Sequence, residues 1–538
     1  MKPKRIWAAV FLVMTAAMLA AQGQDWLWAV RAGGNGNNLS RAVAVSADHS
    51  VFTAGYYTAS YSYGTSFLIN SGGSDIFVAK TGANGTALWA KRAGSTGTDE
   101  AYALALDDAG NILVTGFFRE TVAFGASTLT SAGYSDIFVA KLSPTGSWLW
   151  AARAGGDSND SGWGISLDDA GNVYITGFFD DSADFGASTL VSNGAADIFV
   201  AKLNSSGTWQ WARKLGSSTA DYGKAICTDG SGTSVVTGYF SGTLSVGTVA
   251  VLFCAGGSDI FVAKLNSSGT WIWAKRAGGS TTDYGNAIDL DSAGNCYIAG
   301  SFIGTASFGS DTLTSAGNSD AYVAKLNGNG TWLWARGGGG TGIDTANDVS
   351  VEATDHVYAA GNFSGTASFG PTTITSAGSA DAFAVKLHDN GSWHWVKRGG
   401  DTQGDYAQGI KMDDQKSVYL TGFFYGSATF GTTTLASSDS SDVFIAKLGF
   451  QYPLQPQNLS IAVSGNDLIL DWDPVGYSIY GEPLTPDFYV IYRSTVPFGS
   501  YSFVGITTGT MSTQANDAVN FGRVFYKVTA VKNNPDED

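Results

Sequence analysis

The sequence has few of the residues from which catalytic and metal sites are built. Histidine occurs only four times, at His49, His356, His388 and His394. Their spacing fits no zinc site, and the chain lacks a G-x-S-x-G nucleophile elbow and a glycine-rich phosphate loop. The absence of these motifs argues against a metalloenzyme, a serine hydrolase of the common kind and a nucleotide-dependent enzyme.

Cysteine is equally scarce. Only Cys227, Cys254 and Cys296 are present, and no other repeat of the chain has cysteine at the equivalent positions. An odd number at unrelated positions predicts neither a disulfide framework nor a metal site. We therefore expect three buried, small apolar side chains.

Charged residues make up only 14% of the chain, and acidic residues outnumber basic ones to give a net charge of −16. An acidic surface argues against nucleic acid and anionic membranes as partners. In contrast, glycine is abundant at 71 residues and aromatic residues reach 13%. This composition is typical of a turn-dense, strand-rich fold and not of a disordered chain.

Residues 1–23 have the pattern of a secretory signal peptide. Lys2, Lys4 and Arg5 precede the apolar run Ile6–Ala21, and small residues follow. The run is short for a membrane anchor, which is the alternative interpretation. The sequence thus predicts a bacterial protein that is secreted or held at the cell surface, and that meets a membrane only through this export signal.

A repeat organises most of the chain. The segment Ser135–Gly156, SDIFVAKLSPTGSWLWAARAGG, recurs seven times with small changes, and successive copies lie 61 or 62 residues apart. A fixed period of this kind indicates a propeller, a solenoid or an array. The aspartates that open the copies are Asp75, Asp136, Asp197, Asp259, Asp320, Asp381 and Asp442.

Each repeat contains four strand-like runs, here named A, B, C and D. In the second full repeat they are Trp163–Leu167, Asn172–Phe178, Asp197–Leu203 and Trp209–Arg213. Strand A carries small residues and strand D carries paired tryptophans, which suits blades that are narrow at the axis and wide at the rim. Residues 25–449 are therefore predicted to form an all-β propeller of four-stranded blades.

The two ends of the repeat region complement each other. Trp26–Ala32 is a D strand that has no A, B or C before it, and Asp442–Leu448 is a C strand that has no D after it. We expect the N-terminal strand to complete the last blade. The result would be a closed ring of seven blades.

These residues resemble a known family, the bacterial beta-propeller repeat labelled SBBP. The similarity lies in the D-xx-GN-VY-x-TG-F…sD-x-F-x-AK text at Asp168–Lys202 and Asp291–Lys325, and it covers Asp25–Leu448. Glu352–His356 and Asp413–Ser417 depart from the D-xx-GN turn. The resemblance implies the propeller fold, but it implies no activity because the family has none in common.

After the repeats the composition changes. Residues 450–456 form a proline-marked linker, residues 457–531 carry short alternating strands, and residues 532–538 are a polar tail. Trp472 on the DLILDWDPV strand and the YKVTAV strand are similar to those of a fibronectin type III module. We expect a β-sandwich with Trp472 in its core. The predicted strands are Leu459–Val463, Leu468–Trp472, Phe488–Tyr492, Tyr501–Ile506 and Phe525–Val531.

The aspartate that opens each C strand and the lysine five residues later, such as Asp136 and Lys141, occur once in every blade. A catalytic group occurs once per site, so this pair is interpreted as structural, the aspartate capping a turn and the lysine reaching an adjoining blade. The D-xx-GN turn resembles the start of a calcium loop but lacks the further carboxylates that such a loop requires.

A second acidic position recurs in the loop from D to the next A, at Asp99, Asp160, Asp221, Asp283, Asp344 and Asp405. In a meander this loop lies at the mouth of the central channel. Carboxylates beside aromatic rings are typical of sites that hold a sugar or a calcium ion, whereas the alternative is that each Asp caps its own turn. The predicted ligand-binding residues are Asp160, Trp163, Asp221, Tyr222, Asp283, Tyr284, Asp405 and Tyr406.

Two classes of function remain open. One is a non-catalytic binding or structural protein, an adhesion or scaffold module whose partner is an extracellular protein or a polysaccharide. The other is a carbohydrate-active enzyme, a glycoside hydrolase or lyase, on the channel face. An enzyme requires residues that break the sevenfold pattern, and the clear breaks are Arg119-Glu120 and Asp180-Asp181. We therefore favour the binding protein, as a monomer with no cofactor unless calcium is bound.

Overall fold

The computed structural model describes residues 24–351 and 356–449, together with six strands between residues 460 and 531. The predicted leader 1–23, the linker 450–456 and the tail 532–538 lie outside the described residues. The described chain is all-β, and all its named elements are strands. No helix among the described residues is long and apolar enough to cross a membrane. The chain divides into one compact unit at Trp28–Lys447 and a second that includes the strands after Leu448.

The first unit repeats one four-stranded antiparallel order, inner strand, second strand, third strand, outer strand. The inner strands are β2 (Asn38–Val45), β8 (Glu100–Leu106), β14 (Asp160–Leu167), β20 (Tyr222–Thr228), β26 (Asp283–Leu290), β30 (Thr345–Val351) and β36 (Asp405–Met412). The second strands are β3 (Val51–Tyr57), β9 (Ile112–Phe118), β15 (Val173–Phe179), β21 (Ser234–Phe240), β27 (Cys296–Phe308), β31 (His356–Phe363) and β37 (Val418–Phe430).

The third strands are the Asp-initiated strands of the repeat. They are β6 (Asp75–Thr81), β12 (Asp136–Leu142), β18 (Asp197–Leu203), β24 (Asp259–Leu265), β28 (Asp311–Leu326), β34 (Asp381–His388) and β38 (Thr433–Gly449). The outer strands are β7 (Ala87–Ala93), β13 (Trp148–Ala154), β19 (Trp209–Leu215), β25 (Trp271–Gly279), β29 (Trp332–Gly340), β35 (Trp393–Gly399) and, beside β38, the N-terminal β1 (Asp25–Ala32).

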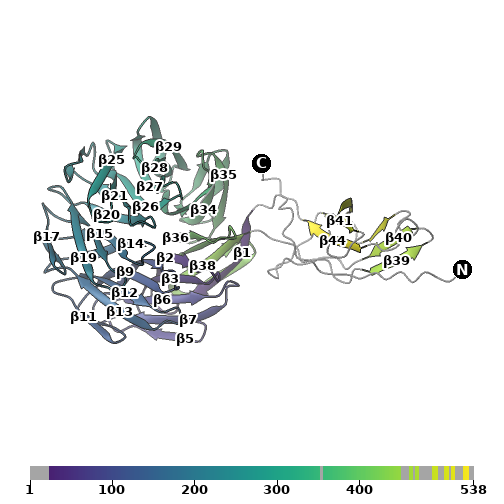
Figure 1. Ribbon diagram of the computed structural model, residues 1–538, viewed down its shortest axis with the longest axis horizontal. Helices are drawn as coiled ribbons and strands as arrows, with labels where there is room; N and C mark the ends of the chain where they lie inside the picture. The colour runs from purple at the N-terminus through teal and green to yellow at the C-terminus, as the bar shows by residue number, and fades with distance from the viewer. Residues whose placement is uncertain are drawn as a thin grey trace. The chain divides into compact units, whose positions relative to one another are not determined.

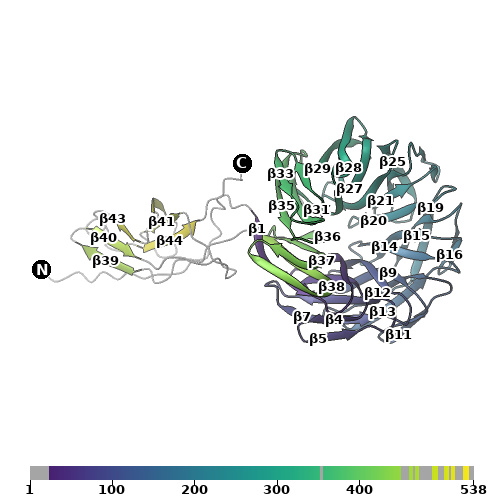
Figure 2. The same ribbon diagram turned by 180° about the vertical axis from the view of Figure 1, so that it is seen from behind.

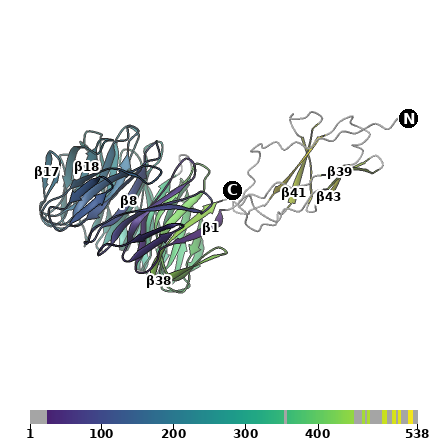
Figure 3. The ribbon, with the colours of Figure 1, turned by 90° about the horizontal axis from the view of Figure 1, so that it is seen from below.

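The sheets are arranged around a common centre, with the inner strands nearest to it (Figure 1). Figures 2 and 3 show the same arrangement from behind and from below. Each inner strand contacts the inner strand of the next sheet, and β2 contacts both β8 and β36. Apolar residues from the facing sheets, for example Ile137 on β12 and Ile175 on β15, form the core between them.

A short hairpin connects the second strand to the third in most of the sheets. The hairpins are β4–β5 (Ser60–Tyr63, Ser66–Ile69), β10–β11 (Thr121–Phe124, Ser127–Thr130), β16–β17 (Ser182–Phe185, Ser188–Val191), β22–β23 (Thr243–Val246, Ala250–Phe253) and β32–β33 (Thr366–Phe369, Thr372–Thr375). Each contacts the outer strand of its own sheet, and bridges such as Gly155↔Asp184 join a hairpin to the outer strand of the preceding sheet. The hairpins therefore cover strand edges that would otherwise be open to pairing.

The paired tryptophans of the outer strands join neighbouring sheets in two directions. The indole N–H of Trp209 donates to the carbonyl of Arg153 in the preceding sheet at 2.9 Å. That of Trp211 donates to the carbonyl of Ser267 in the following sheet at 3.1 Å. A half-exposed indole at the rim thus satisfies its polar group while its ring packs on the sheet.

The third-strand aspartates are structural, as predicted. Asp136 accepts a hydrogen bond from Ala132 N in the turn before β12 at 3.1 Å, and it also forms an ion pair with Arg153. The lysines differ in part from the expectation of a partner on the adjoining sheet. Lys141 pairs at 2.8 Å with Asp107 in its own sheet, whereas Lys264 reaches Gly328 O of the next sheet. The acidic turn lies within reach because it follows the inner strand of the same sheet.

The second unit contains two three-stranded antiparallel sheets, with orders β39-β40-β43 and β42-β41-β44. Their strands are β39 (Ser460–Ser464), β40 (Asp467–Asp471), β41 (Phe488–Ser494), β42 (Ser502–Thr507), β43 (Met511–Gln514) and β44 (Phe525–Val531). Leu470 on β40 and Ile491 on β41 are buried. Strand β43 was not predicted from the sequence, and Trp472 lies outside the described residues.

Candidate functional site

The inner strands share a β-bulge near their N-terminal ends. On β14 the pairing with β15 shifts between Gly162 and Gly164, and the extra residue is Trp163. A bulge leaves one residue out of the ladder and redirects its side chain. The residues at this position line the central cavity, and we name them the mouth ring: Arg41, Tyr102, Trp163, Lys224, Asn286, Asn347 and Gln408.

The mouth ring is chemically different on its two sides. Trp163 lies parallel to Tyr222 at 5.5 Å and meets the edges of Phe178 and Tyr102 at 5.0 and 6.1 Å. This aromatic side comes from β8, β14, β15 and β20. The opposite side carries the amides of Asn286, Asn347 and Gln408 from β26, β30 and β36.

Two residues of the mouth ring, Lys224 and Arg41, are cationic. The Lys224 ammonium lies 3.9 Å from the centroid of the Trp163 ring, which is a cation–π distance. The Arg41 guanidinium lies 5.8 Å from the Tyr102 ring and donates to Gln408 Oε1 at 2.8 Å. Burial, and then the nearby charge of Arg41, lower the pKa of Lys224 to about 8. Within the part of the chain that the structure describes, Lys224 has no carboxylate partner.

The amides serve partly to join neighbouring inner strands. Asn286 Nδ2 donates to Ala346 O at 3.0 Å, and Asn347 Nδ2 donates to Ala407 O at 2.8 Å. The open inner edge of each strand would otherwise leave these carbonyls without a protein partner. These bonds use the Nδ2 end of each amide, and the Oδ1 atoms of Asn286 and Asn347 have no hydrogen-bond partner among the described residues.

Below the mouth ring the cavity narrows and becomes apolar. Its volume is about 460 Å³, which is within the usual range for a small-ligand pocket. Two residues further along each inner strand lies a ring of branched aliphatic side chains. They are Val43, Leu104, Ile165, Ile226, Ile288, Val349 and Ile410.

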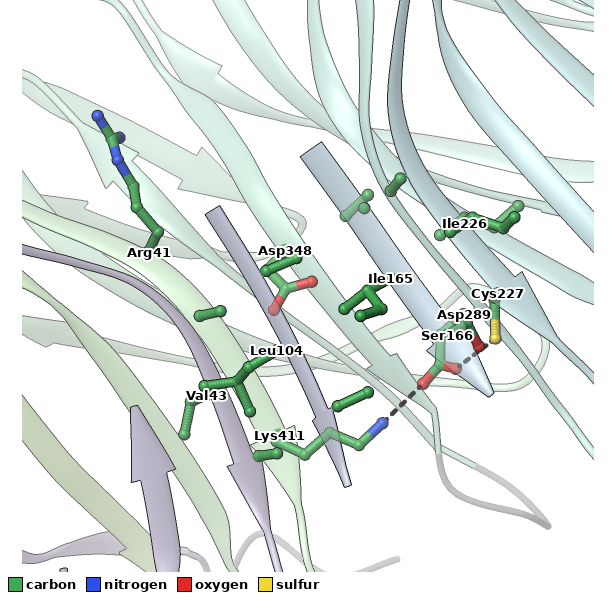
Figure 4. Close-up of a pocket in the computed structure, with 18 of the residues that line it drawn as sticks. Arg41, Val43, Leu104, Ile165, Ser166, Ile226, Cys227, Asp289, Asp348 and Lys411 are labelled. Carbon is green, nitrogen blue, oxygen red and sulfur yellow. Dashed lines mark hydrogen bonds and ion pairs between the residues drawn. The ribbon is translucent and has the colours of Figure 1, made fainter. Parts of the chain in front are cut away.

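A second polar group lies beyond this apolar ring (Figure 4). Asp289 accepts from Cys227 Sγ at 3.3 Å and lies 3.6 Å from Lys411 Nζ, as the dashed lines show. It also accepts from Val351 N of the next inner strand at 3.0 Å. Burial, and then the Asp289 charge, raise the pKa of the Cys227 thiol well above its ordinary value. Cys227 is therefore a neutral hydrogen-bond donor and not a thiolate nucleophile.

Asp348 is the other carboxylate in this part of the cavity. Its oxygens accept from Val349 N at 2.9 Å and from Ile410 N at 2.8 Å. Burial raises its pKa to about 7, although these two hydrogen bonds favour the ionised form. Both carboxylates thus contact the backbone of a neighbouring inner strand, which joins successive sheets around the cavity.

The recurrent aspartates of the D-to-A loops, which were predicted to bind a ligand, are not among the residues that line the cavity. Asp160, Asp221, Asp283 and Asp405 are completely buried. Asp160 accepts from Gly156 N at 2.8 Å and from Asp180 N at 3.3 Å, so it fastens the D-to-A loop to the next hairpin loop. These contacts with backbone amides are those of the turn-cap alternative.

The predicted aromatic residues are divided between two places. Trp163 and Tyr222 stack at the mouth ring. The Tyr222 ring also contacts the Tyr239 ring at a centroid distance of 5.1 Å, and Tyr239 contacts the Tyr284 ring at 4.6 Å. Tyr406 stacks instead on Phe423 at 4.9 Å. The Trp163 ring stacks on Tyr222, and the Lys224 ammonium lies over the same indole, which therefore supports the lysine.

The predicted breaks in the sevenfold pattern are turn residues. Glu120 and Asp181 have φ values of 59° and 53°, at a loop position where Gly304 and Gly365 stand in other sheets. The backbone N–H of Asp180 donates to the Asp160 carboxylate, and that of Arg119 donates to the Asp99 carboxylate at 2.9 Å. These four residues therefore complete the hairpin loops and do not converge on the cavity.

One group of three metal-ligating side chains occurs among the described residues, His49 with Asp413 and Asp414. It lies in the turns at the other end of the inner strands. His49 Nδ1 is 3.2 Å from Asp413 Oδ2, and Asp413 already accepts from Ser417 N and from the Tyr419 hydroxyl. Asp413 thus makes the same contacts as Asp168 does in a D-xx-GN turn, although the sequence Asp413–Ser417 departs from that pattern.

Sequence reasoning missed Arg41, Tyr102, Lys224 and the three amides. The available signal is that the third residue after each D-to-A aspartate differs in chemistry between repeats, whereas small residues surround it. In β20 it is the lysine of Tyr-Gly-Lys-Ala. This variability is the break in repeat symmetry that a binding site needs.

Comparisons with known proteins agree with the repeated sheets. Residues 272–301 match the family model described as SBBP, beta-propeller repeat. The chain is 22% identical to an uncharacterized WD repeat-containing protein of Acanthamoeba polyphaga mimivirus, over 78% of this chain and 38% of the relative. It is 26% identical to the regulatory protein FlaEY of Caulobacter vibrioides, over 68% and 41%. The chain thus spans about two fifths of the length of these relatives.

Among solved structures, that of puromycin hydrolase is similar over 82% of this chain and 59% of that chain, with 9% identity and a TM-score of 0.36. A eukaryotic initiation factor is similar over 92% and 91%, with 8% identity and a TM-score of 0.30. At such values neither likeness bears on function. The chain thus contains a match to the beta-propeller repeat at residues 272–301 and is similar to a WD repeat-containing protein.

Proposed function

We propose that the protein is a secreted or cell-surface propeller of seven blades that binds a small polar ligand or the end of a polysaccharide at its mouth ring, and that it catalyses no reaction on it. The observation that carries the proposal is the mouth ring itself. It is the one set of equivalent positions in the described cavity where aromatic, cationic and amide side chains replace one another from strand to strand. Such variation on a rigid scaffold is typical of binding sites.

The architecture part of the proposal rests on strand pairing. The sheet order β1-β38-β37-β36 supports closure of the ring by the N-terminal strand. The two three-stranded sheets of the second unit, with Leu470 and Ile491 buried, support a fibronectin type III-like sandwich at residues 457–531. Such a module would act as a spacer or docking unit for an extracellular protein or polysaccharide. We propose a monomer, because a closed ring leaves few unpaired edges.

The alternative is a carbohydrate-active enzyme in the channel. A glycoside hydrolase requires two carboxylates on either side of the scissile bond. Asp289 and Asp348 are the carboxylates that line the cavity, and the raised pKa of Asp348 is a property of general acids. However, the oxygens of Asp348 accept two backbone hydrogen bonds, and those of Asp289 contact Cys227, Val351 N and Lys411. These contacts favour a structural role.

The proposal is tested by glycan-array binding of the full chain, followed by calorimetry on each hit. Gln408→Ala, in the mouth ring, should weaken binding at least about threefold. Gln210→Ala removes the same side chain from the exposed outer strand β19 and should leave binding unchanged. Equal affinity of the two variants would place the ligand elsewhere. Hydrolysis of a bound glycan, lost in Asp348→Asn, would overturn the non-catalytic reading.

A further inference from the structure

The two cations of the mouth ring are unusual in this chain. The protein carries 46 acidic against 30 basic residues, and several basic residues of the outer strands pair with acidic residues, as in Arg92–Asp75 at 2.8 Å and Arg398–Asp381 at 2.9 Å. Lys224 and Arg41 instead project into a cavity. Lys224 has no carboxylate within ion-pair distance among the described residues, and Arg41 donates to the neutral Gln408.

Among the described residues, no carboxylate forms an ion pair with either of the two cations. Burial acts against the Lys224 ammonium, and the charge of Arg41 adds to this effect. Glu100 partly balances Arg41 but binds the Tyr102 hydroxyl at 2.9 Å. Two like charges at the mouth of one low-dielectric cavity raise the local concentration of anions. A bound carboxylate would relieve the repulsion and complete the ion pair that Lys224 lacks.

The remainder of the mouth ring suits hydroxyl groups. Asn286 and Asn347 use Nδ2 on neighbouring backbone carbonyls. Their Oδ1 atoms have no hydrogen-bond partner among the described residues and can accept hydrogen bonds from the hydroxyls of a ligand. The apolar ring below them includes Ile288 and Val349 and lines the same cavity.

Resting on the binding function proposed above, we infer that the ligand of the mouth ring is a sugar acid, a saccharide unit whose carboxylate lies between Lys224 and Arg41 and whose hydroxyls face Asn286 and Asn347. A neutral sugar would leave both cations without a counter-ion. An inorganic anion would leave the amide oxygens unused. The acidic surface of the chain makes this mouth the favoured place for an anion to settle.

The test compares three probes on the full chain by calorimetry: glucuronate, glucose and inorganic phosphate. We expect glucuronate to bind at least about tenfold more tightly than either of the others. Lys224→Met should abolish this preference, whereas Lys275→Met on the outer strand β25 should preserve it. Without ligand, Lys224→Met should raise the melting temperature, because it removes an uncompensated buried charge.

The outcomes distinguish a failure of the sugar-acid inference from a failure of the proposed binding function. Equal binding of glucose and glucuronate, unchanged in Lys224→Met, would overturn the sugar-acid inference and leave a saccharide-binding channel standing. Phosphate binding as tight as glucuronate binding would overturn the role of the amides. Failure of every probe and of the whole glycan array would overturn the proposed function as well. If Lys224→Met does not fold, Lys224→Arg, which keeps the charge, must retain the preference for glucuronate.

Discussion

Arg31 and Asp442 form an ion pair at 2.5 Å although 411 positions separate them in the sequence. Arg31 lies on the N-terminal strand β1 and Asp442 on β38, its neighbour in the sheet. The Asp442 side chain is almost completely buried, and it also accepts from Ser438 N and Asn38 Nδ2. One carboxylate thus connects the N-terminal strand, the last repeat and the inner strand β2.

Arg31→Ala should lower the free energy of unfolding by about 2 kcal/mol, because it leaves the buried Asp442 carboxylate without its charged donor. Arg276→Ala is the matched control, since Arg276 pairs in the same way with Asp259 inside a continuous repeat. Deletion of residues 25–34 should have a larger effect than either and should promote aggregation, because it uncovers the edge of β38. Urea denaturation and light scattering measure both effects. A deletion variant with the wild-type melting temperature would exclude closure by β1.

The sandwich proposed for residues 457–531 leads to a second prediction. A segment from Pro453 to Val531 should fold alone, with dispersed amide signals in its NMR spectrum. In that segment Leu470→Ala should cost about 2–5 kcal/mol, because it opens a cavity beside a completely buried side chain. Asp471→Ala, at the exposed neighbouring position, should cost far less. Poorly dispersed amide signals from this segment would contradict an independent domain. So would an equal decrease in the free energy of unfolding for the two variants.

Asp289 should control the reactivity of Cys227. Burial is the main cause of the raised pKa of this thiol and the Asp289 carboxylate is the second. Asp289→Asn should therefore lower the pKa and speed alkylation by iodoacetamide several-fold at about pH 8. Cys254 in the same sample, followed by mass spectrometry, is the internal control. An unchanged rate at Cys227 would mean that access and not charge limits its reaction.

Strand positions were predictable from the sequence because every repeat has runs of apolar residues at the same positions. The predicted run Asp197–Leu203 coincides with β18, and Asn172–Phe178 differs from β15 by a single residue at each end. The mouth ring was not predictable in the same way. It depends on a bulge that adds one residue to each inner strand, and alternation of small residues does not reveal which side chain leaves the ladder.

The surroundings of the buried aspartates could not be predicted from the sequence for a related reason. A recurrent Asp beside Tyr or Trp, as in Asp221-Tyr222, has the same sequence appearance in a turn cap and in a sugar site. Only the structure shows that both Asp221 oxygens accept from backbone amides, those of Ser217 at 2.5 Å and Ser241 at 2.9 Å. The direction of the carboxylate, and not its residue type, decides between the two roles.

Asp405 gives a prediction with a definite pH dependence. Burial, with contributions from Asp381 and Asp401, raises its pKa from 3.8 to about 8 in the folded protein. Between these values the folded state holds a proton that the unfolded state releases. Stability from this group is therefore present below about pH 4 and is lost as the pH rises toward about 8, by at most about 1.4 kcal/mol per pH unit.

Asp405→Asn removes this dependence. The amide oxygen can still accept from Asp401 N at the 2.8 Å contact, and its NH₂ would replace the carboxyl oxygen Oδ1, which has no hydrogen-bond partner among the described residues. Urea denaturation should find the variant more stable than the wild type at about pH 8, with an advantage that shrinks toward about pH 5. Asp221→Asn is the control and should be destabilised at both pH values, because it places an NH₂ against a backbone donor. A stability difference between Asp405→Asn and the wild type that stays constant with pH would show that Asp405 is ionised in the folded protein.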